Sequence, residues 1–483
     1  MSISTAFHNA LSGLSAASRA SVVVSDNIAN ALTPGYTRRS LEVATSHVTG
    51  NGVQVVGVNR HDAPVLTANR RSADAGYAHA KATSEFFSGL EQLVGTANDP
   101  NSITNKLTNF ESSLISAASM PESATRLDTA VTEARHLANA INDASEGLRR
   151  RRSDADRRIG QQVDRLNTAL KDVEDLNARL SKIRAAGGNV AALLDQRQVL
   201  VDEINEIVPV NIVARDNDRI ALYSDGGAIL LDDRAAELSF DLTGDTMPHM
   251  TVGNGLLSGL EINGRPVATS GGTSAIRGGS LAAQFEIRDE LAIEAQQDLD
   301  ALARDLIERF ETPGLDPTVA ATDVGLFTDD GSRFDPAVEI GLAGRLALNT
   351  VVDPDNGGDS WKLRAGLGAT VPGAPGDARQ LKAFGDALTT VRTLPTTRFG
   401  TGSLTAADIS EGLLSRVGQD ANTTAGRMAF ASTTRTELER IEKEQGVDTD
   451  TELQRMMQIE QAYAANARII ETVDELMDTL LRL

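Results

Sequence analysis

Residues 3–36, ISTAFHNALSGLSAASRASVVVSDNIANALTPGY, place apolar or small side chains at alternating intervals of four and three. Heptad spacing sustained in this way is typical of a helix that packs against another helix. The larger side chains of this N-terminal seam are Ile3, Phe7, Leu14, Val24 and Ile28. Pro34 disfavours a helical conformation at Thr33, and Gly35 readily adopts a positive φ. The sequence therefore predicts that the helix ends here.

The turn motif at the end of this helix consists of Asn27, Asn30, Thr33, Pro34, Gly35 and Tyr36. Asn27 and Asn30 lie on the last helical turns, where side-chain amides bond nearby backbone groups. Two alternatives stay open for these amides. They bond either the backbone of the turn or a neighbouring subunit.

The C-terminal segment repeats the heptad spacing and forms a second seam. Its positions are Met456, Ile459, Tyr463, Asn466, Ile470, Val473, Met477 and Leu480. Asn466 alone among them is polar, so the apolar stripe is close to continuous. We expect the two terminal helices to pair with each other and with copies from neighbouring subunits. An ordinary helical core would satisfy the same periodicity.

Composition excludes several classes of protein. The chain has 483 residues and a formal net charge of −21, from 46 Lys and Arg against 67 Asp and Glu. This negative charge argues against sequence-independent binding to nucleic acid or to an anionic membrane. The absence of cysteine excludes disulfides and thiolate metal sites. No stretch reaches the roughly 20 apolar residues that a membrane-spanning helix needs, and the first residues lack the basic region of a Sec-type signal peptide.

The pattern between the terminal helices predicts an α+β multidomain fold. Residues 127–183 keep heptad spacing and predict one helix roughly 85 Å long, followed by a return helix over 190–208. Asp225-Gly226 predicts a hairpin in a β-rich outer portion. The expected domains are a coiled-coil-like axial core (1–36 with 440–483), a mainly helical middle domain (37–209 with 280–310 and 411–439), a β-rich segment (210–279) and a variable Gly-, Pro- and Asp-rich β or loop insertion (311–410).

The sequence contains no constellation that supports an enzyme. Its six histidines include no i, i+4 pair, and no Walker-type phosphate loop is present. Residues 358–361, GDSW, superficially resemble a lipase motif, but no histidine follows them. Asp353, Asp355 and Asp359 lie close together, yet Arg364 stands where a calcium loop has its closing glutamate. We expect no catalytic residue, cofactor or metal site, and ion binding by the three aspartates stays open.

Arg149–Arg152 form a run of four arginines with two interpretations. Such a run either binds an acidic partner or forms a solvated helix face. Glu146, Asp154 and Asp156 are available as partners at helical spacing, so we favour the solvated face.

Both terminal patterns resemble signatures of the flagellar axial family, which comprises rod, hook and hook-associated subunits. The N-terminal match is Asn27-Ile28-Ala29-Asn30-Ala31 followed by Thr33-Pro34-Gly35-Tyr36, and the C-terminal match is 461–470 (QAYAANARII) followed by 474–476 (DEL). Residues 193–197 (LLDQR) with 200–204 (LVDEI), and 278–281 (GGSL) with Arg288-Asp289, resemble the middle of the hook-associated protein 1 family within it. Asp26 and Arg39 depart from the signature, in which Asn and Gln are common.

The resemblance implies a structural protein that forms the junction between hook and filament by helical self-assembly. It implies an extracellular location in the bacterial flagellum, reached through the flagellar type III export apparatus. The implied partners are identical subunits in a ring or helical layer, the hook protein, the adjacent hook-associated junction protein, and a cytoplasmic export chaperone that binds the C-terminal seam.

The main alternative is the hook protein itself or another axial rod or hook subunit. Two unrelated classes explain less of the sequence. A secreted enzyme carried on an axial scaffold is disfavoured because residues 311–410 contain no histidine. A coiled-coil adaptor accounts for the heptads but not for the paired terminal motifs.

Overall fold

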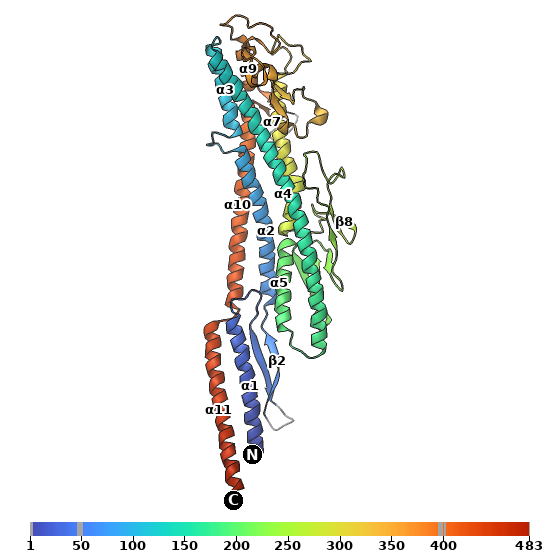
Figure 1. Ribbon diagram of the computed structural model, residues 1–483, viewed down its shortest axis with the longest axis vertical. Helices are drawn as coiled ribbons and strands as arrows, with labels where there is room; N and C mark the ends of the chain where they lie inside the picture. The colour runs from blue at the N-terminus through green and yellow to red at the C-terminus, as the bar shows by residue number, and fades with distance from the viewer. Residues whose placement is uncertain (1–2, 46–51, 395–398, 400–401, 483) are drawn as a thin grey trace.

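The molecule is an elongated rod whose two termini lie at the same end (Figure 1). This computed structural model describes residues 3–45, 52–394, 399 and 402–482. A pair of long helices forms the end that carries the termini, long helices form the middle, and short irregular elements form the opposite end. The expected α+β fold with long terminal helices is confirmed.

The terminal pair consists of α1 (Ile3–Ala29) and α11 (Thr449–Leu481), which lie side by side and antiparallel (Figure 1). The expected pairing of the two helices within one chain is therefore confirmed. Beside α1 lies an antiparallel hairpin of β1 (Arg39–Thr45) and β2 (Val53–Arg60), in which Arg39 stands opposite Arg60.

A bundle of long helices forms the middle of the rod. Its members are α2 (Pro64–Val94), α3 (Ile103–Ser119), α4 (Ala124–Ala185), α5 (Ala191–Ile207), α6 (Gly279–Glu286), α7 (Ala292–Phe310) and α10 (Ala406–Glu444). α4 is the single long helix that the heptads predict, about 93 Å long at 1.5 Å per residue. α5 is the predicted return helix. A π-helical turn at Ile287–Leu291, which the sequence does not predict, joins α6 to α7.

Local chemistry explains where several helices begin. Ser102 caps α3 by accepting a hydrogen bond from the backbone N–H of Asn105. Thr405 and Asp408 form a reciprocal capping box at the start of α10. Pro64 occupies the first turn of α2, where the missing N–H costs no helical hydrogen bond.

Residues 210–279 form two small antiparallel sheets beside α4 (Figure 1). The strands are β3 (Val210–Ala214), β4 (Ile220–Ser224) and β5 (Ile229–Leu231) in one sheet, and β6 (Leu238–Ser239), β7 (Leu260–Ile262) and β8 (Arg265–Val267) in the other. The predicted hairpin at Asp225-Gly226 connects β4 to β5.

The outer end of the rod is built from short elements joined by 3-10 turns. The elements are β9 (Phe327–Asp329) paired with β10 (Leu346–Leu348), α8 (Lys362–Ala365), α9 (Arg379–Thr389), and β11 (Arg392–Thr393) paired with β12 (Ser403–Leu404). The Gly- and Pro-rich composition of this region did not predict α9.

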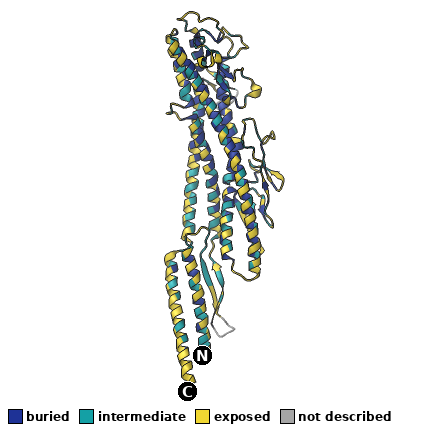
Figure 2. Ribbon diagram, viewed as in Figure 1, coloured by how far each residue is buried: buried dark blue, intermediate teal, exposed yellow. Residues whose placement is uncertain are grey.

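Two hydrophobic clusters stabilise the bundle and the outer end. One includes Phe310, whose ring centroid lies 5.4 Å from that of Phe327 and 5.5 Å from that of Phe384. The other joins α4 and α5 to the small sheets. Over the described residues, neither cluster includes a side chain of α1 or α11. Figure 2 shows the same contrast, because buried residues fill the bundle and are sparse in the terminal pair.

Asp300 is a buried carboxylate of α7 with an altered pKa. It accepts hydrogen bonds from the backbone N–H groups of Gly341 and Ala343 and from the Gln296 side chain, each at 2.8 Å. Burial raises the pKa of Asp300 from 3.8 to about 6, and the hydrogen bonds oppose this shift without cancelling it.

This raised pKa predicts a pH dependence of stability. The folded chain binds the proton of Asp300 more tightly than the unfolded chain, so this contribution is complete below pH 3.8 and is lost as the pH rises through about 6. The loss corresponds to about 3 kcal/mol. We expect urea unfolding of the native chain to show this loss of stability between pH 4 and pH 7. The Asp300→Asn chain should not show the loss. Parallel pH profiles for the two chains would contradict this assignment.

Candidate assembly interface

The structure buries the five residues of the N-terminal seam to different extents. Val24 is buried, whereas Ile3, Phe7, Leu14 and Ile28 are half-buried. Three further buried positions of α1 are the alanines Ala10, Ala16 and Ala17. Alanine leaves room for a close neighbour, but the larger seam residues keep surface that one partner helix does not cover.

The C-terminal seam is covered over part of its length. Met456, Ile459, Asn466 and Ile470 are half-buried, and Val473 is buried. Tyr463, Met477 and Leu480 are exposed at 44%, 46% and 56%. The end of α11 that carries the last two therefore presents apolar side chains to the surroundings.

Two contacts fix the register of α1 against α11. The Ser21 hydroxyl donates a hydrogen bond to Sδ of Met456 at 3.3 Å. The amide of Asn466 lies against Gly13, where an added Cβ would come within 2.8 Å of it. The approach at Gly13 is thus close enough to require glycine unless the Asn466 side chain moves.

Asn27 has no exposed surface and organises the turn motif. Its side-chain oxygen accepts hydrogen bonds from the Tyr36 hydroxyl at 2.9 Å and from the backbone N–H of Arg39 at 3.0 Å. Its amide nitrogen donates to the backbone carbonyl of Arg39 at 2.8 Å and to the carboxylate of Glu452 at 3.0 Å. One side chain therefore joins α1, β1 and α11.

The other asparagine of the turn motif makes local contacts. Asn30 donates to the backbone carbonyl of Asp26 and accepts from the Thr33 hydroxyl. The sequence left two alternatives open for these amides. In the structure both amides bond groups of their own chain, and Asn27 also bonds a side chain of the distant α11.

The remaining residues of the turn motif turn the chain toward α5. Thr33 and Pro34 are exposed. Gly35 has a φ of 75° and packs so closely on α5 that an added Cβ would lie 2.5 Å from a methyl group of Val199. Partial burial raises the pKa of Tyr36, whose ring lies 4.7 Å from the guanidinium carbon of Arg39.

Glu452 is an interface residue that the sequence reasoning missed. Its side chain is 1% exposed and accepts hydrogen bonds from Arg38 at 2.8 Å and Arg455 at 2.7 Å, in addition to that from Asn27. Position 452 lies four residues before Met456 and so continues the C-terminal seam. A carboxylate in an apolar heptad stripe indicates a buried polar partner, and this signal was available in the sequence.

Arginine–carboxylate pairs connect the terminal pair and its hairpin to the bundle. Arg39 and Arg60 share Asp195 of α5, at 2.6 Å and 2.9 Å. Arg70 and Arg71 of α2 share Asp202 of α5, at 2.8 Å and 2.5 Å. Asp195 belongs to the LLDQR stretch and holds the hairpin to the bundle, whereas Asp202 belongs to the LVDEI stretch and joins α2 to α5 within the bundle. Arg39, which departs from the axial signature, supplies one of these ion pairs.

We expect Asn27→Ala to loosen the boundary between α1 and β1. Removing the amide breaks four hydrogen bonds and leaves buried partners unsatisfied, which should cost about 2–3 kcal/mol. The measurement is amide exchange at residues 37–41, which should accelerate accordingly.

Asn30→Ala is the matched control, because its hydrogen bonds are exposed and local. We expect it to leave exchange at residues 37–41 unchanged. Equal acceleration in the two variants would rule out a special role for Asn27.

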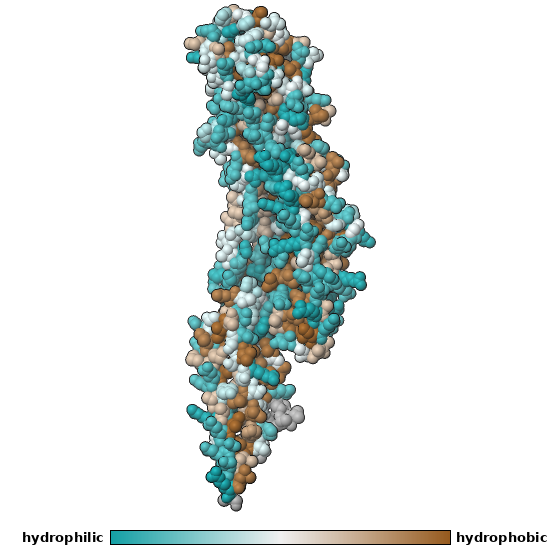
Figure 3. Space-filling view, viewed as in Figure 1, coloured by the Kyte–Doolittle hydropathy of each residue, from teal (hydrophilic) through white to brown (hydrophobic). Residues whose placement is uncertain are grey.

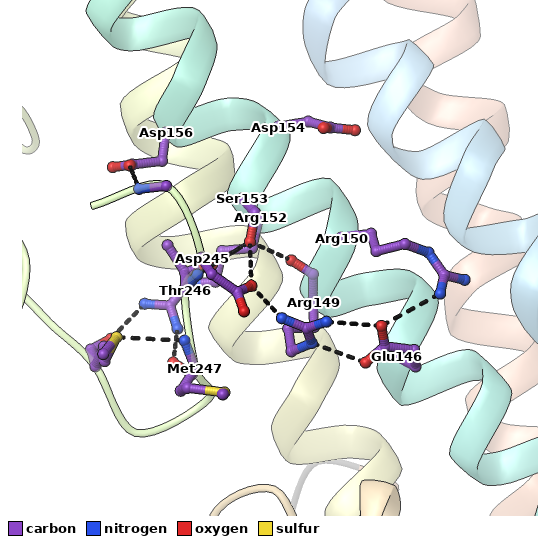
Figure 4. Close-up of polar contacts among 12 residues, drawn as sticks. Glu146, Arg149, Arg150, Arg152, Ser153, Asp154, Asp156, Asp245, Thr246 and Met247 are labelled. Atoms are coloured by element: carbon purple, nitrogen blue, oxygen red, sulfur yellow. Dashed lines mark hydrogen bonds and ion pairs between the residues drawn. The ribbon is translucent and has the colours of Figure 1, made fainter. Parts of the chain in front are cut away.

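The arginine run Arg149–Arg152 lies where α4 meets the loop that follows β6 (Figure 4). Arg149 pairs with Glu146 at 2.7 Å and with Asp245, and Arg150 pairs with Glu146 at 3.3 Å. The expected helical pairing with Glu146 is therefore confirmed. Arg150 is solvent-exposed, as a solvated helix face requires.

The prediction of a solvated face is wrong for Arg152. This side chain is 4% exposed and donates hydrogen bonds to the backbone carbonyls of Arg288, Met247 and Met250, at 2.8, 3.0 and 2.5 Å. Figure 4 shows Arg152 beside Met247. Burial lowers its pKa. Helical spacing of charges did not reveal these partners, because they come from distant parts of the chain.

Two of the three clustered aspartates, Asp353 and Asp355, also bond within the chain. Asp353 is buried and accepts from Arg135 at 3.1 Å and from the backbone N–H of Asp355 at 3.1 Å. Asp355 pairs with Arg135 as well. In the described part of the chain, no group of three or more His, Asp or Glu side chains is arranged to hold a metal ion. Nor is any described helix long and apolar enough to cross a membrane.

Comparison with known proteins relates this chain to flagellar proteins. Residues 87–313 match the model of the flagellar hook-associated protein FlgK helical domain. Residues 7–37 match the model of the flagella basal body rod protein, and residues 443–483 match that of the C-terminal region of flagellar basal body rod FlgEFG proteins. The chain is 25% identical to flagellar hook-associated protein 1 of Escherichia coli over the full length of both chains. The chain is thus similar to flagellar hook-associated protein 1 from end to end.

Two further proteins to which this chain is similar are also hook-associated or hook junction proteins by name. Flagellar hook-associated protein 1 of Bacillus subtilis is 25% identical over 97% of this chain and 96% of its own. The solved structure of the flagellar hook junction protein FlgK from Burkholderia pseudomallei is similar with a TM-score of 0.45, at 17% identity over 55% of this chain and 46% of that chain.

This similarity identifies the chain as a structural component of the bacterial flagellum. The sequence-based identification and the expected structural role are thereby confirmed. The two rod-protein matches coincide with α1 plus its turn motif and with α11. The helix pair is therefore the part of this chain that matches the rod-protein models.

Proposed function

We propose that this chain forms the junction between hook and filament by packing its α1–α11 pair against the pairs of identical neighbours. The observation that supports this proposal is the apolar surface that the pair leaves uncovered. Besides Tyr463, Met477 and Leu480, the exposed apolar side chains are Leu11, Val22, Leu453, Met457, Ile469, Leu476 and Leu481. Figure 3 shows apolar residues gathered on the lower part of the rod, where the pair lies.

The free energy from covering this surface is sufficient for assembly. Burying a Leu, Ile or Phe side chain contributes roughly 1.5–3 kcal/mol, so even partial burial of these positions exceeds the cost of ordering one subunit. Neighbouring pairs would cover Ile3, Phe7, Leu14 and Ile28 on one side and the exposed end of α11 on the other. The seams are thus proposed to act in two contacts, one within the subunit and one between subunits.

The proposed domains follow one another along the rod. Residues 1–36 with 440–483 form the axial core, and residues 37–209 with 280–310 and 411–439 form the helical middle domain. The β-rich segment 210–279 and the insertion 311–410 lie outside. The turn motif marks the boundary at which the chain leaves the core.

Further partners follow from the position of a junction subunit. The hook protein would bind one side of the layer and the adjacent hook-associated junction protein the other. Before export by the flagellar type III route, a cytoplasmic chaperone would cover the apolar surface of α11. Deleting residues 440–483 should abolish chaperone binding, and undiminished binding would refute this part of the proposal.

Locating the protein on isolated flagella tests the proposed position. Antibody labelling viewed by electron microscopy should mark a narrow zone between hook and filament. Labelling along the entire hook would instead support the alternative, an axial hook subunit.

A further inference from the structure

α10 presents an exposed aromatic side chain on the side turned away from the bundle. Phe430 is 76% exposed. Ala421 lies on the buried side of α10, and Phe430 follows it by about two and a half helical turns, which places the ring on the opposite side of the helix. Gly426 and Thr433, one turn before and one turn after Phe430, are small and exposed. The surface around the ring therefore leaves room for a neighbour to approach closely.

A groove on another side of the bundle has the size for such a ring. This α2–α4 groove lies between α2, α4 and the π-turn that follows α6, and its volume is about 140 Å³. Its apolar lining consists of Ala82, Phe86, Ala155 and Ile287. A cavity of about 150 Å³ with apolar walls accommodates benzene. The phenyl group of Phe430 therefore matches the groove in size.

The α2–α4 groove also contains a cation with which no carboxylate pairs. Arg151 of α4 lines the groove, and its guanidinium lies against Gly89 of α2, in the space that a Cβ at this glycine would fill. Arg151 forms no hydrogen bond or ion pair with the residues that the structure describes, and burial lowers its pKa. The nearby Asp154 pairs with Arg157 instead. An aromatic ring over the guanidinium would stabilise its charge through a cation–π contact.

Phe430 and the α2–α4 groove lie at nearly the same height along the rod. α10 runs antiparallel to α2, because Arg435 pairs with Asp74 at 3.0 Å and Gly418 lies beside Glu91. Phe430 and the α2 residues of the groove fall between these two contacts, within about two helical turns of each other. Subunits standing side by side in one layer would therefore bring the ring of one copy to the groove of the next with little displacement along the rod.

Charged residues beside the two surfaces are complementary. Arg427 lies one turn before Phe430 and is exposed, and no described carboxylate lies within ion-pair distance of it. Glu85 lines the groove and is 52% exposed. Its contacts with Lys81 and Arg158 are both 4.0 Å long, well beyond the usual length of a charge-assisted hydrogen bond. Glu85 is therefore free to pair with an incoming cation such as Arg427.

We infer that Phe430 of one subunit inserts into the α2–α4 groove of its lateral neighbour, with Arg427 opposite Glu85. A closed ring of identical subunits needs two different surfaces that fit each other, and this pair of surfaces meets that need. α10 continues the line of α11 along the rod (Figure 1), so the contact is continuous with the proposed packing of the terminal pairs. The inference rests on the proposed assembly and adds a contact between bundles within the same layer.

Cysteine cross-linking tests the contact directly, because the native chain contains no cysteine. Gly426→Cys lies one turn from Phe430, at a site where an added Cβ meets open space, and Arg158→Cys lies in the groove. In flagella assembled from the full chain carrying both substitutions, oxidation should link one copy to the next. A link within one chain is excluded, because α2 lies between α10 and α4 (Figure 1).

The matched control combines Gly426→Cys with Arg157→Cys. Arg157 and Arg158 are neighbours on α4 with similar exposure, 51% and 55%, but Arg157 does not line the groove. We expect at least about tenfold less cross-linking from this control. Equal cross-linking in both chains, or none in the groove chain although antibody labelling shows normal assembly, would overturn the inference. The latter outcome leaves the proposed junction role intact, whereas absence of the native chain from the junction would refute the role itself.

Charge reversal provides a second test in case the cysteine chains do not assemble. Arg427→Glu should reduce incorporation at least about tenfold, because it places a carboxylate opposite Glu85 of the neighbour. Every subunit carries both surfaces, so adding Glu85→Arg to the same chain should restore incorporation. Normal incorporation of the single variant, or failure of the second change to restore it while circular dichroism shows a folded bundle, would overturn the inference. A hook protein or chaperone in the groove predicts that failure, because its own charge is unchanged.

Discussion

Replacing Arg288 by alanine is expected to lower the free energy of unfolding by about 3–5 kcal/mol, the range for removing one partner of a buried ion pair. Arg288 lies in the π-turn between α6 and α7 and has no exposed side-chain surface. It pairs with Asp156 of α4 at 2.8 Å and with Asp289 at 2.8 Å, and donates to the backbone carbonyl of Ser258 at 2.9 Å. It therefore links the helical bundle to the β-rich segment.

The loss should be large because Asp156 cannot reach water. Asp156 is completely buried and would keep only its bonds from the backbone N–H groups of Thr243 and Gly244. The guanidinium also lies 5.2 Å from the ring of Phe240 and 5.1 Å from that of Phe285, so its removal opens a cavity between two aromatic side chains.

Urea unfolding followed by circular dichroism measures the loss, and amide exchange over residues 238–262 locates it. Arg150→Ala is the control, because Arg150 is 61% exposed and makes a single ion pair with Glu146. We expect the control to change stability by less than about 0.5 kcal/mol. A comparable change in both variants would show that Arg288 does not hold the β-rich segment.

Leu14→Asp and Ile470→Asp are each expected to prevent incorporation at the junction while leaving the bundle folded. Both residues are half-buried in the terminal pair, which lies outside the two hydrophobic clusters. Each substitution replaces apolar contact by a carboxylate that neighbouring pairs would have to desolvate. The combined loss of several kcal/mol at every subunit should reduce incorporation more than about 100-fold.

Electron microscopy of flagella with antibody labelling gives the readout, and circular dichroism reports whether the bundle is folded. Leu242→Asp is the matched control, since it makes the same change at an exposed leucine of the β-rich segment. Normal labelling by Leu14→Asp or Ile470→Asp chains would count against assembly through the helix pair.

The long helices could be predicted from the sequence because their apolar side chains recur with helical spacing. α1, α4 and α11 lie where the heptads placed them, and α5 is the predicted return helix. The predicted seams also include the contacts of Met456 and Asn466 with α1. Periodicity succeeds here because each helix packs along its length on another helix, so one face repeats the same environment.

The polar contacts between distant segments could not be predicted in the same way. Arg152 bonds carbonyls that lie about a hundred residues or more away in sequence, and Asp195 pairs with Arg39 across 156 residues. Local charge spacing carries no information about such partners. The π-turn was missed for a related reason, because its Arg288 is held by Asp156, Ser258 and Phe240 from distant parts of the chain as well as by the adjacent Asp289.

The polar boundary between the terminal pair and the bundle has a mechanical consequence. Its ion pairs join Arg39 and Arg60 of the hairpin to Asp195 of α5, while the hydrophobic clusters stop short of α1 and α11. Added salt screens such pairs, since the Debye length falls from about 10 Å at 0.1 M to about 3 Å at 1 M ionic strength. The bundle should therefore twist more easily about the terminal pair as ionic strength rises. The torsional stiffness of this boundary is therefore expected to depend on the salt concentration of the surrounding medium.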